Sequence, residues 1–250
     1  MKKLIAFDLD GTLAESKSPL PDRMSELLNE LLDHFQVCVI SGGKFGQFEK
    51  QLLGNLKAEP AKLERLHLMP TCGTRYFTFN LVKNDWEQVY AEDFTEAEKA
   101  EIITALTEGV KRAGFDKEKL WGEQIEDRGS QITFSALGQE APIDAKEEWD
   151  PDNTKKLKVR GIVAEMIPQF EVRAGGSTSI DITKLGIDKA YGMTKLMDIL
   201  QIGKDDILFM GDRLQEGGND YPVKAMGIDS LEVSHWQDTA RSLQAILHVL

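Results

Sequence analysis

Two hydrophobic patterns alternate at both ends of the chain. Short apolar runs, which are typical of strands buried on both faces of a parallel sheet, occupy residues 4–7, 37–40 and 207–210. Apolar residues that return every three or four positions, as on one face of a helix, occupy residues 24–35, 45–56 and 193–200 and the segment that ends near Leu250. Alternating strands and helices predict an α/β fold with a doubly wound parallel sheet, of the Rossmann-like kind.

The middle of the chain has a different pattern. TEAE at 95–98 has the spacing of a capping box and opens a predicted helix, and QITFSAL and TSIDI are typical of strands. A charged loop around AKEEWDPDNTKK and a helix over 159–167 come between these two strands. Strands with a pair of helices predict a smaller α+β domain at 91–184, inserted into a core made of residues 1–90 and 185–250.

Composition narrows the classes of function. The formal charge of -12, from 42 acidic and 30 basic residues, repels phosphate backbones and anionic lipids, so we expect neither nucleic acid nor a membrane as partner. Acidic residues interrupt the apolar N-terminal stretch too early for a signal peptide. Cys38 and Cys72 are too few for a disulfide framework, which favours a cytoplasmic location.

Carboxylates follow directly after two of the predicted strands. Asp8 and Asp10 follow the first strand in FDLDGT, and Asp212 follows the strand 207–210 in ILFMGDRLQEGGND. An Asp-Gly pair alone is a common turn, but in a doubly wound sheet the carboxyl ends of the strands form the ligand site. Like charges so close together need a cation or protons to offset them, and hard oxygen ligands suit Mg²⁺. The pattern therefore predicts a site for a metal and an anion.

Four motifs, in order, resemble those of the haloacid dehalogenase (HAD) superfamily of phosphotransferases. DLDGT is similar to its first motif, VISGG to its second, the lysine of GIDK to its third and GDRLQEGGND to its fourth. The predicted insert lies between the second and third motifs, which resembles the α+β cap of the type-IIB branch. The resemblance implies Mg²⁺-dependent phosphoryl transfer by the core, with the cap choosing the substrate.

The resemblance implies a catalytic role for four residues. Asp8 would be the nucleophile that forms an aspartyl-phosphate. Asp10 would be the general acid and then the general base. Ser41 would donate a hydrogen bond to a phosphoryl oxygen, and Lys189 would neutralise the phosphoryl group and the nucleophile.

Further residues are assigned to the substrate and the metal by the same resemblance. Thr12 would order the loop at the substrate, and the amide of Gly42 would assist Ser41. The implied Mg²⁺ ligands are Asp8, Asp10 through its backbone carbonyl, Asp212, Asn219 and Asp220, the last two as ligands or as residues that position a bound water.

The fourth motif and the stretch before GIDK are similar to those of eukaryotic-type phosphomannomutases. The match implies that Ser179 and Asp181 face the sugar and that Arg128, in IEDRGSQ, contacts a phosphate. These mutases hold a second phosphate with several cap arginines, whereas we read Trp121 and Gln139 at the aligned positions. Neither side chain can replace a guanidinium group.

Water is the easier acceptor when the cap holds fewer phosphate-binding arginines. The sequence therefore predicts a Mg²⁺-dependent phosphatase of a small phosphorylated metabolite of the sugar-phosphate class, acting as a monomer or homodimer. If Arg160 or Arg173 replaces the missing arginines, a phosphomannomutase-like phosphosugar mutase is the alternative. For Arg128, Ser179 and Asp181, a purely structural role on a sheet face is the alternative.

A non-catalytic sugar-phosphate binder is a third alternative. It is disfavoured because the sequence retains a complete set of reactive side chains, including the nucleophile that a binder does not need.

Overall fold

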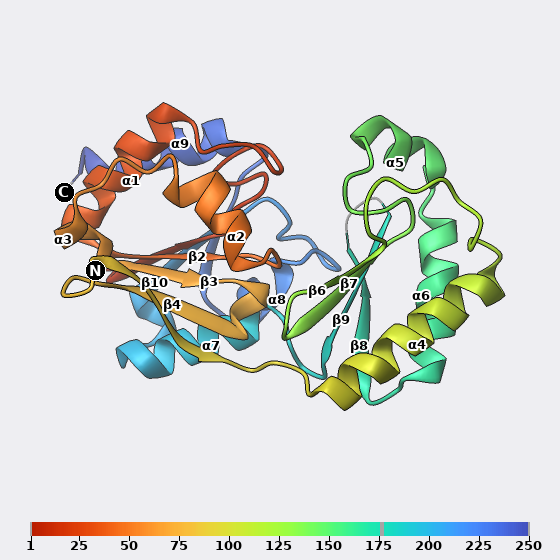
Figure 1. The fold of residues 1–250 in the computed structure, drawn as a ribbon. Helices are drawn as coiled ribbons and strands as arrows, with labels where there is room; N and C mark the ends of the chain where they lie inside the picture. Colours follow the sequence, from red (N-terminus) through yellow and green to blue (C-terminus); the bar gives the residue numbers. More distant parts are fainter. Residues whose placement is uncertain (1, 176–177, 250) are drawn as a thin grey trace. The chain divides into compact units, whose positions relative to one another are not determined.

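The computed structural model describes residues 2–175 and 178–249, and these form two compact units (Figure 1). The first unit consists of Met1–Ala91 and Asp188–Leu250, and the second of Glu92–Ile187. The two boundaries lie one and three residues after those expected from the sequence. Each unit has its own sheet and its own apolar core.

The described part of the first unit contains a seven-stranded sheet in the order β11-β10-β1-β2-β3-β4-β5. Its strands are β1 (Leu4–Phe7), β2 (Gln36–Ile40), β3 (Leu66–Met69), β4 (Arg75–Asn80), β5 (Asp85–Ala91), β10 (Ile207–Gly211) and β11 (Asp229–Glu232). From β11 to β3 all pairings are parallel, which confirms the predicted α/β fold. The strands β4 and β5 are antiparallel, because only the short turn η2 (Thr71–Gly73) joins β3 to β4 and a parallel crossover needs a longer connection.

The strand order reverses at β1. From β1 the chain continues to β2 on one side, whereas β10 joins β1 from the other side. Phe7 pairs with Met210, and the amide of Asp8 donates to the carbonyl of Met210 at 3.0 Å. Residues that follow β1 and β10 therefore emerge side by side at the point where ligands bind in sheets of this class.

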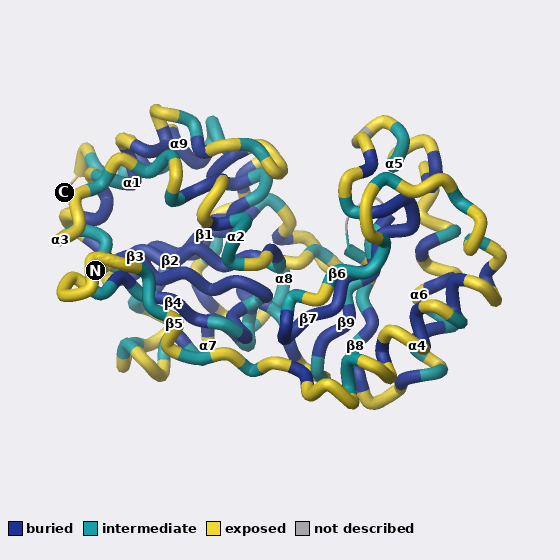
Figure 2. The backbone as a smooth tube through the Cα atoms, in the orientation of Figure 1, coloured by how far each residue is buried: buried dark blue, intermediate teal, exposed yellow. Residues whose placement is uncertain are grey.

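Helices cover both faces of this sheet, and the central strands between them are buried (Figure 2). Ile5 and Phe7 share one core cluster with residues of α1 and α9, and Leu4 and Ala6 share another with residues of α7. One face carries α1 (Asp22–His34) and α9 (Trp236–Leu247), and the other carries α7 (Lys189–Leu200). The remaining helical segments are α2 (Phe45–Phe48), the π-helical turn η1 (Glu49–Leu53), α3 (Pro60–Leu63), the 3-10 turn η3 (Lys204–Asp206) and α8 (Tyr221–Ala225).

The described part of the second unit is an antiparallel sheet in the order β6-β7-β9-β8 with helices. Its elements are β6 (Ile125–Asp127), β7 (Gln131–Ser135), β8 (Phe170–Ala174), β9 (Ser179–Lys184), α4 (Glu96–Ala113), α5 (Ile143–Trp149) and α6 (Thr154–Met166). Helix α4 begins with the predicted capping box of Thr95 and Glu98. Among the described residues of both units, no helix combines the length and the apolar character needed to cross a membrane.

The segment predicted as a charged loop around residues 145–156 is instead mostly helical. Helix α5 follows Pro142 and ends at Trp149, whose side chain is buried in the core of the unit. The carboxylate of Asp150 then accepts hydrogen bonds from the backbone amides of Lys155 and Lys156, at 2.9 and 3.0 Å, at the start of α6. Because one buried aromatic residue at the end of a charged helix produces no repeating pattern of apolar residues, the sequence did not indicate this helix. The prediction of a loop was wrong here.

A buried histidine on β3 is held by two side chains. The Nδ1 of His67 lies 2.8 Å from the hydroxyl of Tyr76, and Nε2 lies 2.9 Å from Oε1 of Gln36. Because an amide oxygen only accepts, Nε2 carries the proton and Nδ1 accepts from the tyrosine hydroxyl. Burial lowers the pKa of His67 to about 4.

This lowered pKa predicts a pH dependence of stability. Between about pH 4 and the ordinary histidine value of 6.5, the unfolded chain binds a proton at His67 that the folded protein does not. The stability that neutral His67 contributes should be complete above pH 6.5 and fall by about 2–3 kcal/mol towards pH 4. We expect the difference in free energy of unfolding between wild type and His67→Gln to shrink accordingly in urea titrations, and parallel pH curves would contradict the assignment.

Candidate active site

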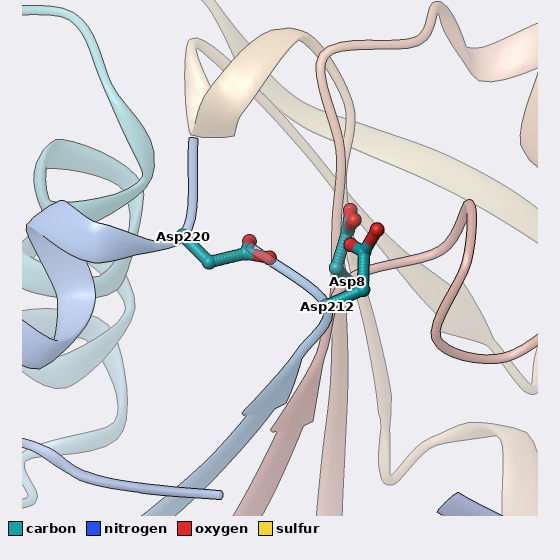
Figure 3. A group of neighbouring side chains, drawn as sticks. All are labelled: Asp8, Asp212 and Asp220. Atoms are coloured by element: carbon teal, nitrogen blue, oxygen red, sulfur yellow. The ribbon is translucent and has the colours of Figure 1, made fainter. Parts of the chain in front are cut away.

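Three carboxylates meet at the strand ends of the first unit (Figure 3). Asp8 follows β1, Asp212 follows β10, and Asp220 immediately precedes α8. Each offers an oxygen, and these oxygens all lie within 4.8 Å of one another. Asp8 and Asp220 are buried, and Asp212 is partly exposed.

Lys189, the first residue of α7, bridges two of these carboxylates. Its Nζ lies 2.6 Å from Oδ1 of Asp8 and 2.5 Å from Oδ1 of Asp220, and its side chain is fully buried. Burial alone would lower the pKa of Lys189, but the two carboxylates raise it above the usual lysine value, so the ammonium stays charged. Burial raises the pKa of Asp8, and Lys189 opposes that rise.

The donor set fits a divalent cation. With all four groups ionised, one ammonium faces three carboxylates, which leaves an excess of two negative charges at a largely buried place. Burial and, to a smaller extent, the neighbouring Asp220 raise the pKa of Asp212. Hard carboxylate oxygens and this charge balance suit Mg²⁺.

Glycine is required in the loop that carries this site. Gly11 has a φ of +84°, and a Cβ there would lie 2.6 Å from Oδ2 of Asp212. The next residue, Thr12, is fully buried, and its carbonyl accepts a hydrogen bond from the hydroxyl of Thr239 at 2.7 Å. This position fits the loop-ordering role of Thr12 better than a direct substrate contact.

Ser41 lies directly after β2. Its hydroxyl accepts a hydrogen bond from the backbone amide of Gly43 at 3.2 Å, and its carbonyl accepts one from the backbone amide of Cys72 at 2.9 Å. A Cβ on Gly42 would meet no atom within 4 Å, so the backbone at Gly42 borders open space.

The side chain of Asp10 has partners outside the carboxylate cluster. Its Oδ1 accepts hydrogen bonds from the backbone amide of Lys17 at 2.7 Å and from Nε2 of Gln51 at 3.0 Å. Its Oδ2 accepts a hydrogen bond from Nε2 of Gln47 at 2.8 Å. The sequence analysis missed both glutamines. Their four-residue spacing in GQFEKQLL is the signal that marks them as neighbours on one helix face.

Asn219, the remaining predicted metal ligand, is exposed next to the buried Asp220. The backbone amide of Arg213 donates to Oδ2 of Asp220 at 3.0 Å and holds the loop of the fourth motif in a tight turn.

In the second unit, Asp181 lies in a polar network across two strands. Its Oδ1 accepts hydrogen bonds from Nε2 of Gln131 at 3.0 Å and from the hydroxyl of Thr133 at 2.7 Å, and both of these residues belong to β7. Burial raises the pKa of Asp181, and the nearby Arg128 opposes that rise. Ser179 lies two residues before Asp181 on β9, so both side chains are on the same face of the sheet.

The arginine predicted to bind phosphate in this unit has a partner. Nε and Nη2 of Arg128 lie 2.8 and 2.7 Å from Oε2 of Glu126. Nε of Arg160 donates to the carbonyl of Val172 at 2.8 Å, and Nη1 of Arg173 donates to that of Ile187 at 2.9 Å. Each of the three guanidinium groups thus uses at least one N–H group in a hydrogen bond within the second unit.

The two residues read in place of mutase arginines have structural contacts. Trp121 packs against the core of the second unit, with Nζ of Lys119 4.6 Å from its ring centre. Nε2 of Gln139 lies 3.4 and 3.3 Å from the carbonyls of Gln124 and Thr133.

The chain matches a family model, several related sequences and, at lower identity, several solved structures. A family model described as haloacid dehalogenase-like hydrolase matches residues 5–222. A phosphomannomutase from Encephalitozoon cuniculi is 25% identical over 259 residues, covering 98% of this chain and 94% of that protein. A phosphomannomutase from Spinacia oleracea is 25% identical over 241 residues, covering 88% of this chain and 85% of that protein.

Solved structures match at lower identity. The truncated, IMP-bound IMP-nucleotidase of Plasmodium falciparum has a TM-score of 0.72 at 18% identity, covering 99% of this chain and 68% of that one. SMU.1108c from Streptococcus mutans has a TM-score of 0.67 at 16% identity, covering 99% of this chain and 100% of that one. These similarities show the fold.

The bridging role of Lys189 predicts a stability change. Lys189→Met keeps the apolar stem but removes the ammonium between Asp8 and Asp220, so the free energy of unfolding should fall by about 3–5 kcal/mol. Added MgCl₂ should raise the melting temperature of the variant more than that of wild type, because the cluster is one charge more negative. Thermal unfolding followed by circular dichroism measures both effects.

Lys3→Met is the control, since Lys3 is exposed where it pairs with Asp206. Equal losses of stability in the two variants would contradict the special position of Lys189.

Proposed function

The chain belongs to the haloacid dehalogenase-like hydrolase family, and we propose that it is a Mg²⁺-dependent phosphatase of a small phosphorylated metabolite of the sugar-phosphate class. The observation that carries the proposal is the contact of Lys189 with Asp8, 2.6 Å apart and buried, next to two further carboxylates. It supports a site in which Asp8 would be the nucleophile, Lys189 a fixed positive charge and the neighbouring carboxylates the metal ligands. The cysteine content supports a cytoplasmic location.

In the first half-reaction, a carboxylate oxygen of Asp8 forms a bond to phosphorus while the bond from phosphorus to the leaving oxygen breaks. Asp10 gives a proton to that leaving oxygen. Lys189 offsets the negative charge of the nucleophile and of the phosphoryl group. The hydroxyl of Ser41 and the amide of Gly42 donate to a phosphoryl oxygen.

In the second half-reaction, water attacks the phosphorus of the aspartyl-phosphate and gives a proton to Asp10. The bond from phosphorus to Asp8 breaks, which regenerates the carboxylate and releases inorganic phosphate. The Mg²⁺ ligands would be Asp8, Asp212, Asp220, Asn219 and the backbone carbonyl of Asp10. When bound there, the ion supplies positive charge that stabilises the transferring phosphoryl group.

Substrate selection is assigned to the second unit. Asp181 and Ser179 offer a carboxylate and a hydroxyl for sugar hydroxyl groups, and Arg128 offers a guanidinium for a phosphate. The hydrogen bonds from Gln131 and Thr133 fix the carboxylate of Asp181 before substrate arrives.

A phosphomannomutase-like phosphosugar mutase is the second candidate. It is favoured by the curated phosphomannomutases, which match nearly the whole chain. The phosphatase is preferred because Trp121 and Gln139 stand at the aligned arginine positions and because Arg160 and Arg173 donate to backbone carbonyls.

Phosphorus NMR separates the two candidates. Purified protein is incubated with Mg²⁺ and mannose-1-phosphate, with and without catalytic glucose-1,6-bisphosphate. A phosphatase accumulates inorganic phosphate in both samples. Formation of mannose-6-phosphate only in the sample with bisphosphate would establish the mutase and overturn the proposal.

Asp8→Asn tests the nucleophile. An amide cannot form the acyl-phosphate, so turnover should fall by about a thousandfold or more, while calorimetry should still detect phosphate binding in the presence of Mg²⁺. Asp22→Asn, at an exposed residue paired with Lys57, should keep wild-type turnover. Full activity of Asp8→Asn would exclude the covalent mechanism, and a wild-type protein that binds sugar phosphates without turnover would point to the non-catalytic binder.

A further inference from the structure

We propose that Gln47 and Gln51 are positioning residues that hold the carboxylate of Asp10 for proton transfer. The inference rests on the role that the proposed function gives to Asp10. It extends that role to two side chains outside the four motifs that carry the family resemblance.

The two amides form a closed pattern of hydrogen bonds around Asp10. Nε2 of Gln47 donates to Oδ2 of Asp10 at 2.8 Å and to Oε1 of Gln51 at 2.5 Å. Nε2 of Gln51 donates to Oδ1 of Asp10 and to the carbonyl of Ser18, both at 3.0 Å. Each NH₂ group therefore uses both of its hydrogens, and together the amides hold both oxygens of the carboxylate.

The glutamines are carried by a helical segment that packs into the apolar core of the first unit. Gln47 belongs to α2, and Gln51 belongs to the π-helical turn η1 that follows it directly. Phe48 and Leu52, which follow each glutamine in the sequence, are fully buried in the apolar core. Gln51 is itself only 3% exposed. Turns of the π type are rare and frequently occur at functional sites.

The second motif also makes room for this arrangement. A Cβ on Gly43 would lie 2.2 Å from Oε1 of Gln47. The glycine that follows Ser41 and Gly42 thus permits the amide of Gln47 to reach Asp10. The phosphate-binding turn and the position of the acid–base carboxylate are therefore set by the same short segment.

Proton transfer requires this precision. A general acid acts only within hydrogen-bond distance of the atom that it protonates, and a displacement of about 1 Å can cost about a hundredfold in rate. Asp10 lies in a loop rather than in a strand or helix, so its side chain depends on such contacts. A merely structural role for the glutamines would hold the loop but give no dependence on the leaving group.

The leaving group provides the test. Gln47→Met and Gln51→Met keep the side-chain length and remove the donors, and kcat/KM is measured for mannose-1-phosphate and for p-nitrophenyl phosphate. Nitrophenolate leaves without a proton, whereas the sugar oxygen needs one. We expect kcat/KM to fall about 10- to 100-fold for mannose-1-phosphate and less than about threefold for p-nitrophenyl phosphate. Equal falls for both substrates, or no fall, would overturn the inference.

Two controls make the result specific. Gln244→Met changes an exposed glutamine on α9 and should leave both rates unchanged. Gln47 is partly exposed, so Gln47→Met serves as the test if the buried Gln51→Met variant does not fold.

Asp10→Asn separates the possible failures. It should show the same dependence on the leaving group, and Gln47→Met added to it should cost nothing further for mannose-1-phosphate. If Asp10→Asn slows both substrates alike, the acid role of Asp10 fails, and both the proposed mechanism and this inference are overturned. If Asp10→Asn shows the pattern and the glutamine variants do not, only the positioning role is overturned.

Discussion

The buried contacts of Lys189 with Asp8 and Asp220 are the interaction on which the first unit depends. Charges removed from water are costly unless each has a close partner, so one ammonium must reach both carboxylates at once. Those residues come from the end of β1, the start of α7 and the loop before α8. One lysine therefore constrains three features of the unit: the register of β1 against β10, the position of α7 on the sheet and the turn of the fourth motif.

Much of this arrangement follows from the sequence because its elements are regular. Continuous apolar runs predicted β1, β2 and β10, and parallel topology then places the residues after them at one edge. Asp8 and Asp212 were expected to converge for that reason, and their convergence needs no knowledge of side-chain conformation. The strands β4 and β5 were not among the predicted elements, and the antiparallel direction of β4 follows from the short connection before it and not from its own pattern.

The parts that the sequence did not reveal depend on contacts between distant polar residues. Gln47 and Gln51 read as ordinary polar positions of an amphipathic helix, and nothing local shows that this face meets Asp10. The partners of Asp181 follow from the pairing of β7 with β9, which joins residues about fifty positions apart. Hydrophobic periodicity tells which side of an element is buried, but it does not tell which polar atoms meet.

The first unit is built from two segments of the chain that are separated by the second unit, and this has a consequence for biosynthesis. On the ribosome, β1 is made first, but its neighbour β10 ends only at Gly211, so one edge of β1 stays unpaired during about 10–40 s of synthesis. The second unit is contiguous from Glu92 to Ile187, and all of its described strands are available before β10 emerges. The carboxylate cluster, which needs Asp220, can thus assemble only late in synthesis, and of the described elements only α8, β11 and α9 follow it along the chain.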